Sequence, residues 1–284
     1  MARVEPLIGK YVHMVVQGIE YRVYFEERGN GIPLVCQHTA GSDGRQWRHL
    51  LNDGDVASKY RVIVPDLPYH GKSLPPESIE WWKEDYKLSK GFFIDFHVAF
   101  SHALDLKKPV YIGCSMGGHL AVDLALEKPD EFRAVIGVQA ALHSPGVTIE
   151  WFHHPRISND FRATAMLGMS SQRSPEKYRR ECSWEYSQSA PSVFPGDLCY
   201  YFLDHDLRGK AHKIDTSRIS VYLLTGEYDP DTSHDVTQEL ANQIKGAKFT
   251  PMTGVGHFGM VENFEAFKKY LMPVLDEIAR AKPQ

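Results

Sequence analysis

Cysteine is scarce in this sequence, with only four residues in 284. They lie far apart, at positions 36, 114, 182 and 199, and form neither a CxxC pair nor any other paired spacing. The sequence therefore carries no sign of a disulfide framework, and a reducing, cytoplasmic setting is the expectation.

Positive charge is also in short supply. Lysine and arginine together number 32 against 36 aspartates and glutamates, which gives a formal net charge of −4. This balance is evidence against nucleic acid or an anionic membrane as the main partner. No apolar run approaches the length of a membrane span, and residues 1–6 lack the apolar core of a signal peptide, so we expect neither element. The expected partner is a small-molecule substrate. The sequence leaves the oligomeric state open, and a homodimer is one possibility.

The sequence does contain enough apolar residues for a substantial core, since 43% of its residues are hydrophobic. Short β-rich or apolar runs alternate with segments of helical spacing. The expected strands cover residues 11–16, 19–26, 33–37, 61–65, 110–112, 134–139, 219–225 and 248–252. The expected helices cover residues 92–106, 116–127, 232–245 and 262–281. This alternation predicts an α/β fold with a mostly parallel, doubly wound sheet covered on both faces.

One long segment, from about Leu142 to Asp215, breaks the alternation. It holds no clear buried strand and is rich in aromatic residues, and a structureless loop of this length is improbable inside a compact domain. We therefore expect a helical cap at residues 142–215, inserted into an α/β core formed by residues 1–141 and 216–284. Trp151, near the start of the cap, is the aromatic side chain that we expect to face the substrate.

The most informative motif is Gly113-x-Ser115-x-Gly117, which stands between an apolar strand and a helix. In that context the motif describes a nucleophile elbow, a turn so tight that its central residue is strained. Glycines two residues before and after the serine remove collisions with neighbouring backbone. Ser115 is therefore the predicted nucleophile.

A serine hydroxyl is a poor nucleophile near neutral pH, so it needs a base, and the base needs an orienting acid. Asp229 lies in the loop after an apolar strand, and His257 lies in a glycine-flanked loop after the last expected strand. The order serine, aspartate, histidine is the one expected of an α/β-hydrolase. We expect Ser115, Asp229 and His257 to form a catalytic triad.

Asp229 has rivals nearby in Glu227, Asp231 and Asp235. It is preferred because it lies three residues past Gly226, on the turn that leaves the strand.

Other chemically active side chains are interpreted as structural. Cys114 is out of frame with the glycines and is expected to be a packed small residue. His153 with His154, and the run 204–206, resemble metal ligands, but neighbouring residues on a helix point apart. The sequence therefore predicts no metal and no cofactor.

Four segments carry a family resemblance that spans nearly the whole chain: residues 38–42 with Trp47, residues 66–73, residues 113–118, and residues 226–229 with 256–257. The sequence resembles the α/β-hydrolase superfamily, in the capped group that includes small-ester hydrolases, lactonases and meta-cleavage-product C–C hydrolases. The resemblance implies that the backbone N–H groups of Ala40 and Met116 form an oxyanion hole. Thr39 replaces a glycine that the family usually has, and its hydroxyl is expected, with Phe258 and Trp151, to reach substrate.

The expected reaction is acyl transfer to water through an acyl-enzyme. The main hypothesis is a serine hydrolase of a carboxylic ester or lactone with a small apolar or aromatic substrate. The first alternative is a C–C hydrolase of a vinylogous 1,5-diketone, because residues 113–118 are similar to Gly-Asn-Ser-Met-Gly-Gly of those enzymes. In that case arginines of the cap would hold a substrate carboxylate, and the candidates are Arg156, Arg162, Arg179 and Arg180. The second alternative is a non-catalytic ligand receptor on the same fold.

Overall fold

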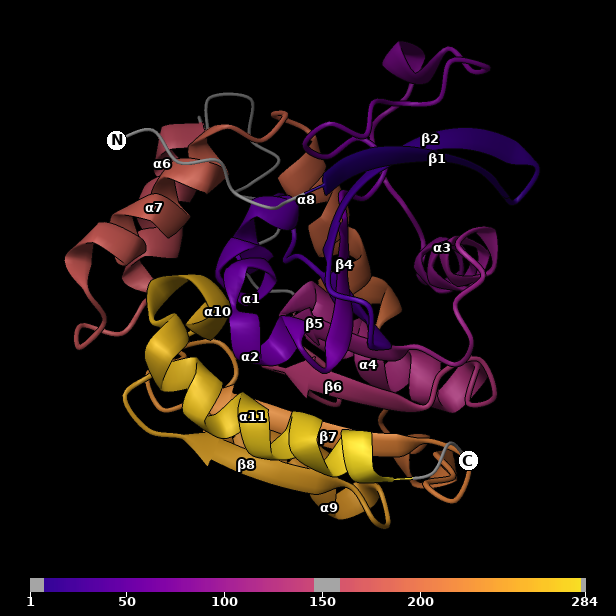
Figure 1. Ribbon diagram of the computed structural model, residues 1–284. Helices are drawn as coiled ribbons and strands as arrows, with labels where there is room; N and C mark the ends of the chain where they lie inside the picture. The colour runs from indigo at the N-terminus through magenta and orange to yellow at the C-terminus, as the bar shows by residue number, and fades with distance from the viewer. Residues whose placement is uncertain (1–7, 146–158, 282–284) are drawn as a thin grey trace.

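The computed structural model describes residues 8–145 and 159–281. Its centre is an eight-stranded sheet in the order β1-β2-β4-β3-β5-β6-β7-β8 (Figure 1). β1 and β2 form an antiparallel hairpin and β2 is antiparallel to β4, whereas the neighbours from β4 to β8 are parallel. The strands are β1 (Ile8–Val16), β2 (Ile19–Arg28), β3 (Ile32–Gln37), β4 (Tyr60–Pro65), β5 (Val110–Cys114), β6 (Ala134–Val138), β7 (Ser220–Gly226) and β8 (Lys248–Met252).

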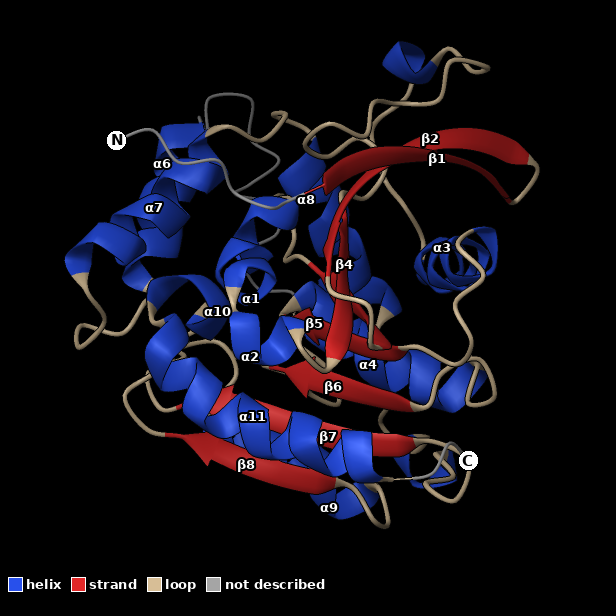
Figure 2. Ribbon diagram, viewed as in Figure 1, coloured by secondary structure: helices blue, strands red, loops and turns tan. Residues whose placement is uncertain are grey.

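Helices cover both faces of this sheet (Figure 2). α1, α2 and α11 lie on one face, and α3, α4 and α9 lie on the other. Their bounds are α1 (Arg48–Asn52), α2 (Gly54–Ala57), α3 (Lys90–Ala103), α4 (Met116–Glu127), α9 (His234–Gln243) and α11 (Phe264–Arg280). The predicted mostly parallel, doubly wound α/β sheet is confirmed.

The central strands explain why the sheet is covered on both sides. Every residue of β5 and of β6 is buried, and their sequences are continuous apolar or glycine runs rather than alternating patterns. A strand of that composition carries apolar side chains on both faces, which favours a layer of helices on each face of the sheet. Because the strands are parallel, the segments that follow β3, β5, β7 and β8 all leave the same edge of the sheet.

The chain leaves the sheet after β6 and returns at β7, and the described part of this excursion is helical. It contains α6 (Asn159–Gly168), α7 (Glu176–Ser187), α8 (Val193–Cys199), a π-helical turn η3 (Tyr200–Asp204) and a short 3-10 turn η4 (Ala211–Lys213). α6 and α7 pack against each other at the upper left of Figure 1. Trp151 lies outside the described residues, and the division into a core and a cap domain stays a prediction.

The expected helix over residues 262–281 is divided in the structure. A short helix, α10 (Gly259–Glu262), ends before α11 begins at Phe264. Asn263 separates them because its backbone is not helical (φ −159°, ψ 70°) and its side chain accepts a hydrogen bond from the Ala266 amide. Asparagine in this role is an N-cap, so α11 starts at this residue rather than continuing α10.

Candidate active site

Ser115 follows directly on β5 and precedes the first residue of α4. Its backbone has φ 58° and ψ −115°, a left-handed conformation that costs a non-glycine residue about 1–3 kcal/mol. A Cβ on Gly113 would lie 2.5 Å from the Gly117 backbone, and one on Gly117 would lie 2.7 Å from Gln37 Cγ. Only glycine fits either position, which is why the motif predicts the turn.

The amide of Met116 is placed by the same turn. Met116 is the first residue of α4, so its N–H belongs to the helix amides that have no acceptor inside the helix. The Ser115 amide donates to Val138 O at 2.9 Å, and Ser115 O accepts from the His119 amide at 2.9 Å, which anchors the turn to β6 and α4. The N-terminus of α4 thus places the Met116 amide and the positive end of the helix dipole next to Ser115.

His257 and Asp229 meet at the same edge of the sheet. His257 Nδ1 lies 2.8 Å from Asp229 Oδ2, and both side chains are almost fully buried. Because a carboxylate can only accept, Nδ1 carries the proton and Nε2 is left as the basic nitrogen of the neutral ring. The Asp231 and Thr232 amides donate to Asp229 Oδ1 at 2.9 and 3.1 Å, so the carboxylate is held in place from its other side.

The rival carboxylates have different partners. Glu227 accepts from the Gly254 amide at 2.8 Å, Asp231 accepts from the Tyr201 hydroxyl, and Asp235 lies in the first turn of α9.

The charge around His257 favours its protonated form. Burial alone would lower the pKa of His257, but the contact with Asp229, helped by Asp231 and Glu262, outweighs it and raises the pKa above the ordinary value of 6.5. Glu262 in α10 reaches this region by accepting from the Gly256 and Ser171 amides. An imidazole with a raised pKa is a stronger base, and its charged form is stabilised when it takes a proton.

The loop after β3 contains Ala40, whose backbone N–H is the other donor expected in the oxyanion hole. His38 Nδ1 lies 2.9 Å from Thr39 O, and the Leu67 amide donates to His38 Nε2 at 3.1 Å. His38 is therefore a neutral ring with its proton on Nδ1, and burial lowers its pKa to about 4. The Ser42 amide also donates to Thr39 O, at 3.3 Å. Because C=O and N–H point in opposite directions across a trans peptide, these two contacts direct the Ala40 N–H away from His38.

Ser115, His257 and Ala40 line one cavity with a volume of about 280 Å³. Most of its walls are apolar side chains from the helices between β6 and β7. The full set of lining residues is Ala40, Ser115, Ala165, Met166, Met169, Tyr186, Phe194, Leu198, Tyr201, Phe202, Pro230, Asp231 and His257. The sequence signalled these helices only through the high aromatic content of the segment and did not single out their lining residues.

Two of the residues expected to contact substrate, Thr39 and Phe258, are not among the described residues that line this cavity. Thr39 does not line this cavity: its hydroxyl contacts the Tyr186 hydroxyl and lies 3.1 Å from Gln46 Oε1. Phe258 is completely buried and packs against His257 and Tyr186, behind the cavity wall. The substrate roles assigned to both residues stay predictions.

The expected carboxylate-binding arginines are also absent from the described cavity lining. Arg162 is buried in α6 and donates to Asn159 Oδ1 at 2.9 Å, and Arg180 pairs with Glu176 on the surface of α7. Arg179 does not line the cavity, and Arg156 lies outside the described residues.

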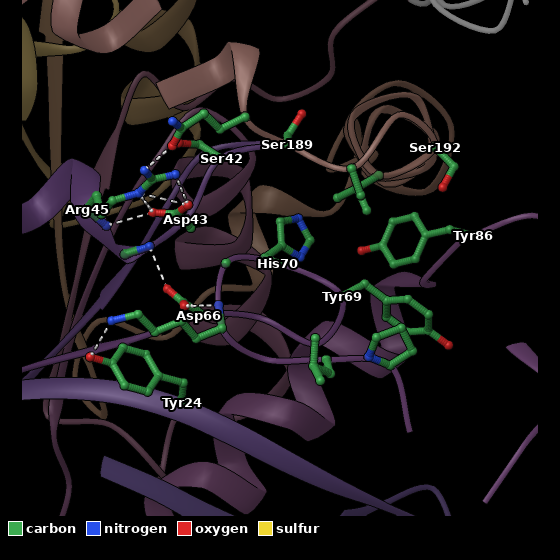
Figure 3. Close-up of a pocket in the computed structure, with 18 of the residues that line it drawn as sticks. Tyr24, Ser42, Asp43, Arg45, Asp66, Tyr69, His70, Tyr86, Ser189 and Ser192 are labelled. Carbon is green, nitrogen blue, oxygen red and sulfur yellow. Dashed lines mark hydrogen bonds and ion pairs between the residues drawn. The ribbon is translucent and has the colours of Figure 1, made fainter. Parts of the chain in front are cut away.

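A larger cavity of about 790 Å³ is lined in part by residues 42–45 of the segment after β3 (Figure 3). Asp66, Tyr69, His70 and Tyr86 are among the residues that line it, and Ser115 is not. Asp66 accepts from the Gly44 and Lys72 amides at 2.8 and 2.7 Å, so it ties two loops together.

Residues 8–145 and 159–281 contain neither a metal-binding cluster nor a membrane-spanning helix. No group of three or more histidine, cysteine, aspartate or glutamate side chains there is arranged to hold a metal ion. No helix in the same ranges is long and apolar enough to cross a membrane.

Comparisons with known proteins agree with this architecture. The family profile described as alpha/beta hydrolase fold matches residues 32–172. A 2-hydroxymuconate semialdehyde hydrolase from Pseudomonas sp. (strain CF600) is 27% identical over 96% of this chain and 95% of its own length. A thermophilic esterase from Thermogutta terrifontis has a TM-score of 0.82 at 18% identity, covering 95% of this chain and 99% of that chain. The enol-lactonase from Burkholderia xenovorans LB400 has a TM-score of 0.78 at 19% identity, covering 93% and 99%. The chain belongs to the α/β-hydrolase superfamily.

Proposed function

We propose that this protein is a serine hydrolase that cleaves a carboxylic ester or lactone of a small, uncharged and largely apolar substrate. The observation that carries the proposal is the shared cavity of Ser115 and His257, with Asp229 hydrogen-bonded to the far nitrogen of the imidazole. A nucleophile, a base and an orienting acid are the parts that acyl transfer requires.

In the proposed mechanism, His257 takes the proton of Ser115 as the serine oxygen attacks the substrate carbonyl. Negative charge develops on the carbonyl oxygen, which the amides of Ala40 and Met116 stabilise. His257 then gives its proton to the leaving alcohol, and an acyl-enzyme remains. Water, activated by the same imidazole, attacks the acyl group and releases the acid, while Asp229 keeps the imidazole in the useful tautomer.

The cavity supports an uncharged substrate. Its described walls are mainly apolar, and its volume of about 280 Å³ suits a small acyl group. Apart from His257 and the tyrosines, the ionisable side chain among the described residues of the wall is Asp231. When it is ionised, Asp231 would repel a nearby substrate carboxylate. Burial raises the pKa of Asp231 above the ordinary aspartate value.

A second candidate is the hydrolysis of a C–C bond in a vinylogous 1,5-diketone acid. It is favoured by the relative named 2-hydroxymuconate semialdehyde hydrolase, whose similarity covers 96% of this chain. Such a substrate carries a carboxylate, and no lysine or arginine is found among the described residues that line the cavity. For this reason the ester or lactone is the preferred substrate class.

The test is a hydrolysis screen across p-nitrophenyl esters, lactones and ring-cleavage dienones, with the Ser115→Ala protein as control. We expect turnover of short-chain esters or lactones, and a loss of about 10⁴–10⁶ in kcat for the variant. Preferential turnover of dienones would favour the second candidate. Tight ligand binding without turnover of any class would favour the receptor alternative.

A further inference from the structure

A completely buried carboxylate reaches from α8 towards the loop after β3. Asp197 accepts hydrogen bonds from the Gly41 amide at 2.7 Å, from His70 Nε2 at 2.8 Å and from the Tyr86 hydroxyl at 2.7 Å. Its three donors come from three separate segments of the chain. A buried carboxylate with this many donors is a strong and directional contact.

His70 is held in its charged form by its surroundings. Its Nδ1 lies 2.9 Å from Pro68 O and its Nε2 lies 2.8 Å from Asp197, and both of these oxygens can only accept. Both ring nitrogens must therefore carry protons, which makes His70 an imidazolium paired with the Asp197 carboxylate. Burial alone would lower the pKa of His70, but the attraction of Asp197 outweighs it and raises that pKa. Figure 3 shows His70 in the wall of the larger cavity, with the Tyr86 hydroxyl directed towards it.

Gly41 connects this ion pair to the proposed oxyanion hole. It is the residue after Ala40, has φ +65°, and lies so close to α8 that a Cβ on it would be 2.5 Å from Phe194 Cβ. The peptide group after Ala40 is therefore held by Asp197, while the peptide group before Ala40 is held by His38 through Thr39 O. Both peptide planes next to the Ala40 Cα are anchored, which leaves the Ala40 N–H little freedom to turn.

We propose that Asp197, charge-paired with His70, is a positioning residue that holds the Ala40 amide in place for the oxyanion of the transition state. The inference rests on the proposed function, because an oxyanion forms only if the protein carries out acyl transfer. Asp197 does not line the cavity of Ser115 and His257, so it acts through Gly41 and Ala40 rather than by touching substrate.

This role predicts a particular kinetic effect. A donor aimed at the oxyanion stabilises the transition state more than the bound ester, so disturbing it lowers kcat and leaves KM nearly unchanged. A carboxylate that only fastened α8 to the core would instead change thermal stability, or raise KM by altering the cavity wall.

The experiment compares Asp197→Ala and Asp197→Asn with two control variants, using p-nitrophenyl butyrate as substrate. Tyr86→Phe removes another hydrogen bond to the same carboxylate but keeps the contact with Gly41. Asp160→Asn removes an exposed carboxylate of α6 that does not line the cavity. Inhibition by a butylboronic acid adds a second readout, because its tetrahedral adduct with Ser115 places an oxygen where the oxyanion forms.

We expect Asp197→Ala to lower kcat by about 10- to 100-fold and to leave KM within about threefold of that of the unaltered protein. This decrease in kcat is no larger than the one expected when an oxyanion donor is removed entirely. Boronate affinity should fall in parallel. Asp197→Asn should show a smaller loss of the same kind, since its amide oxygen can still accept from Gly41. Both controls should stay within about threefold of the original kcat.

If Asp197→Ala does not fold, Asp197→Asn decides the question by the same two readouts. Folded Asp197 variants that keep the kcat and the boronate affinity of the unaltered protein would overturn the inference, while the proposed function stands. A rise in KM alone would do the same. A protein that hydrolyses no ester, or a Ser115→Ala variant that stays active, would overturn the proposed function itself.

Discussion

Ser115 occupies a backbone conformation that glycine would adopt without strain. Its φ of 58° places it in the left-handed region, and the surrounding turn, anchored to Val138 O and to α4, maintains that conformation. Part of the folding free energy is therefore used to present one hydroxyl group.

Ser115→Gly should accordingly stabilise the protein while abolishing turnover. We expect a gain of about 1 kcal/mol in the free energy of unfolding, because glycine has no side chain to oppose this φ. Ser115→Ala is the matched control, since it removes the same hydroxyl but keeps the strain. Urea unfolding of the three proteins makes the comparison, and equal stability of the glycine and alanine variants would contradict the argument.

The pH dependence of activity follows from His257. The imidazole must be neutral to act as a base, and the net effect of Asp229 and its acidic neighbours is to raise its pKa above 6.5. Activity should therefore rise with pH through a single acid limb whose midpoint lies above 6.5.

The measurement is kcat/KM for an uncharged ester between pH 5 and 9. Asp229→Asn should move the midpoint down and lower the rate, since the charge that raises the pKa is gone. A flat profile, or a midpoint below 6.5 in the unaltered protein, would show that His257 is not the base.

At the scale of elements, the helices between β6 and β7 supply the cavity wall and the sheet supplies the reactive groups. Met166 in α6 lines the cavity and is largely buried. Truncating it enlarges the space for the acyl group without touching Ser115 or His257.

Met166→Ala should therefore shift chain-length preference. Lost contacts in an apolar pocket are worth about 1–3 kcal/mol, so kcat/KM for butyrate should fall roughly tenfold while acetate is little affected. Longer acyl chains should gain relative to butyrate. Phe161→Ala, an exposed residue of α6, is the control. An unchanged profile across acetate, butyrate and hexanoate esters would remove α6 from the specificity wall.

The sequence predicted those parts of the site that depend on short-range patterns. Ser115 is a candidate because the turn itself needs the glycines at 113 and 117. Asp229 is a candidate because it follows an apolar strand, and His257 because it lies in a glycine-flanked loop after the last expected strand. Strands β5 and β6 could be found because burial on both faces requires continuous apolar runs.

Other parts depend on contacts between distant residues and leave no local pattern. Asp197 is 156 residues from Gly41 and 127 from His70, so nothing near Asp197 in the sequence indicates either partner. The proton position on His38 depends on the Leu67 amide, 29 residues away. The expectation of one helix over residues 262–281 does not include the division between α10 and α11, which depends on the non-helical backbone of Asn263.

At the scale of the whole molecule, buried histidines make stability depend on pH in both directions. Burial lowers the pKa of His38 to about 4 and of His97 to about 3, whereas the net effect of the surroundings raises the pKa of His70 and His257. In the unfolded chain all four return to about 6.5.

The sign of each contribution follows from linkage. His38 and His97 stay neutral in the folded protein, so the unfolded chain binds more protons below pH 6.5, and stability is lost as pH falls towards 3–4. His70 and His257 stabilise the folded protein fully below 6.5, and this is lost as pH rises through their raised folded values.

The melting temperature should therefore be highest near pH 6.5 and fall on both sides. On the acid side, the free energy of unfolding should decrease by an amount on the order of a few kcal/mol. His97→Gln should flatten the acid side, even if it lowers the maximum. Differential scanning calorimetry from pH 4 to 9 measures both curves. An acid slope that is identical in the two proteins would exclude His97 as a cause.

The parallel sheet gathers its proposed reactive groups from residues 40, 115, 229 and 257, on four connections that leave one edge. No fragment that ends before β8 contains His257, and none that starts at α1 or later contains Ala40. Catalytic activity therefore indicates that the whole sheet has formed, since a partly folded chain lacks at least one of the proposed reactive groups. The same geometry suits a complementation assay, in which two separately expressed pieces, divided between β6 and β7, regain turnover only on reassociation.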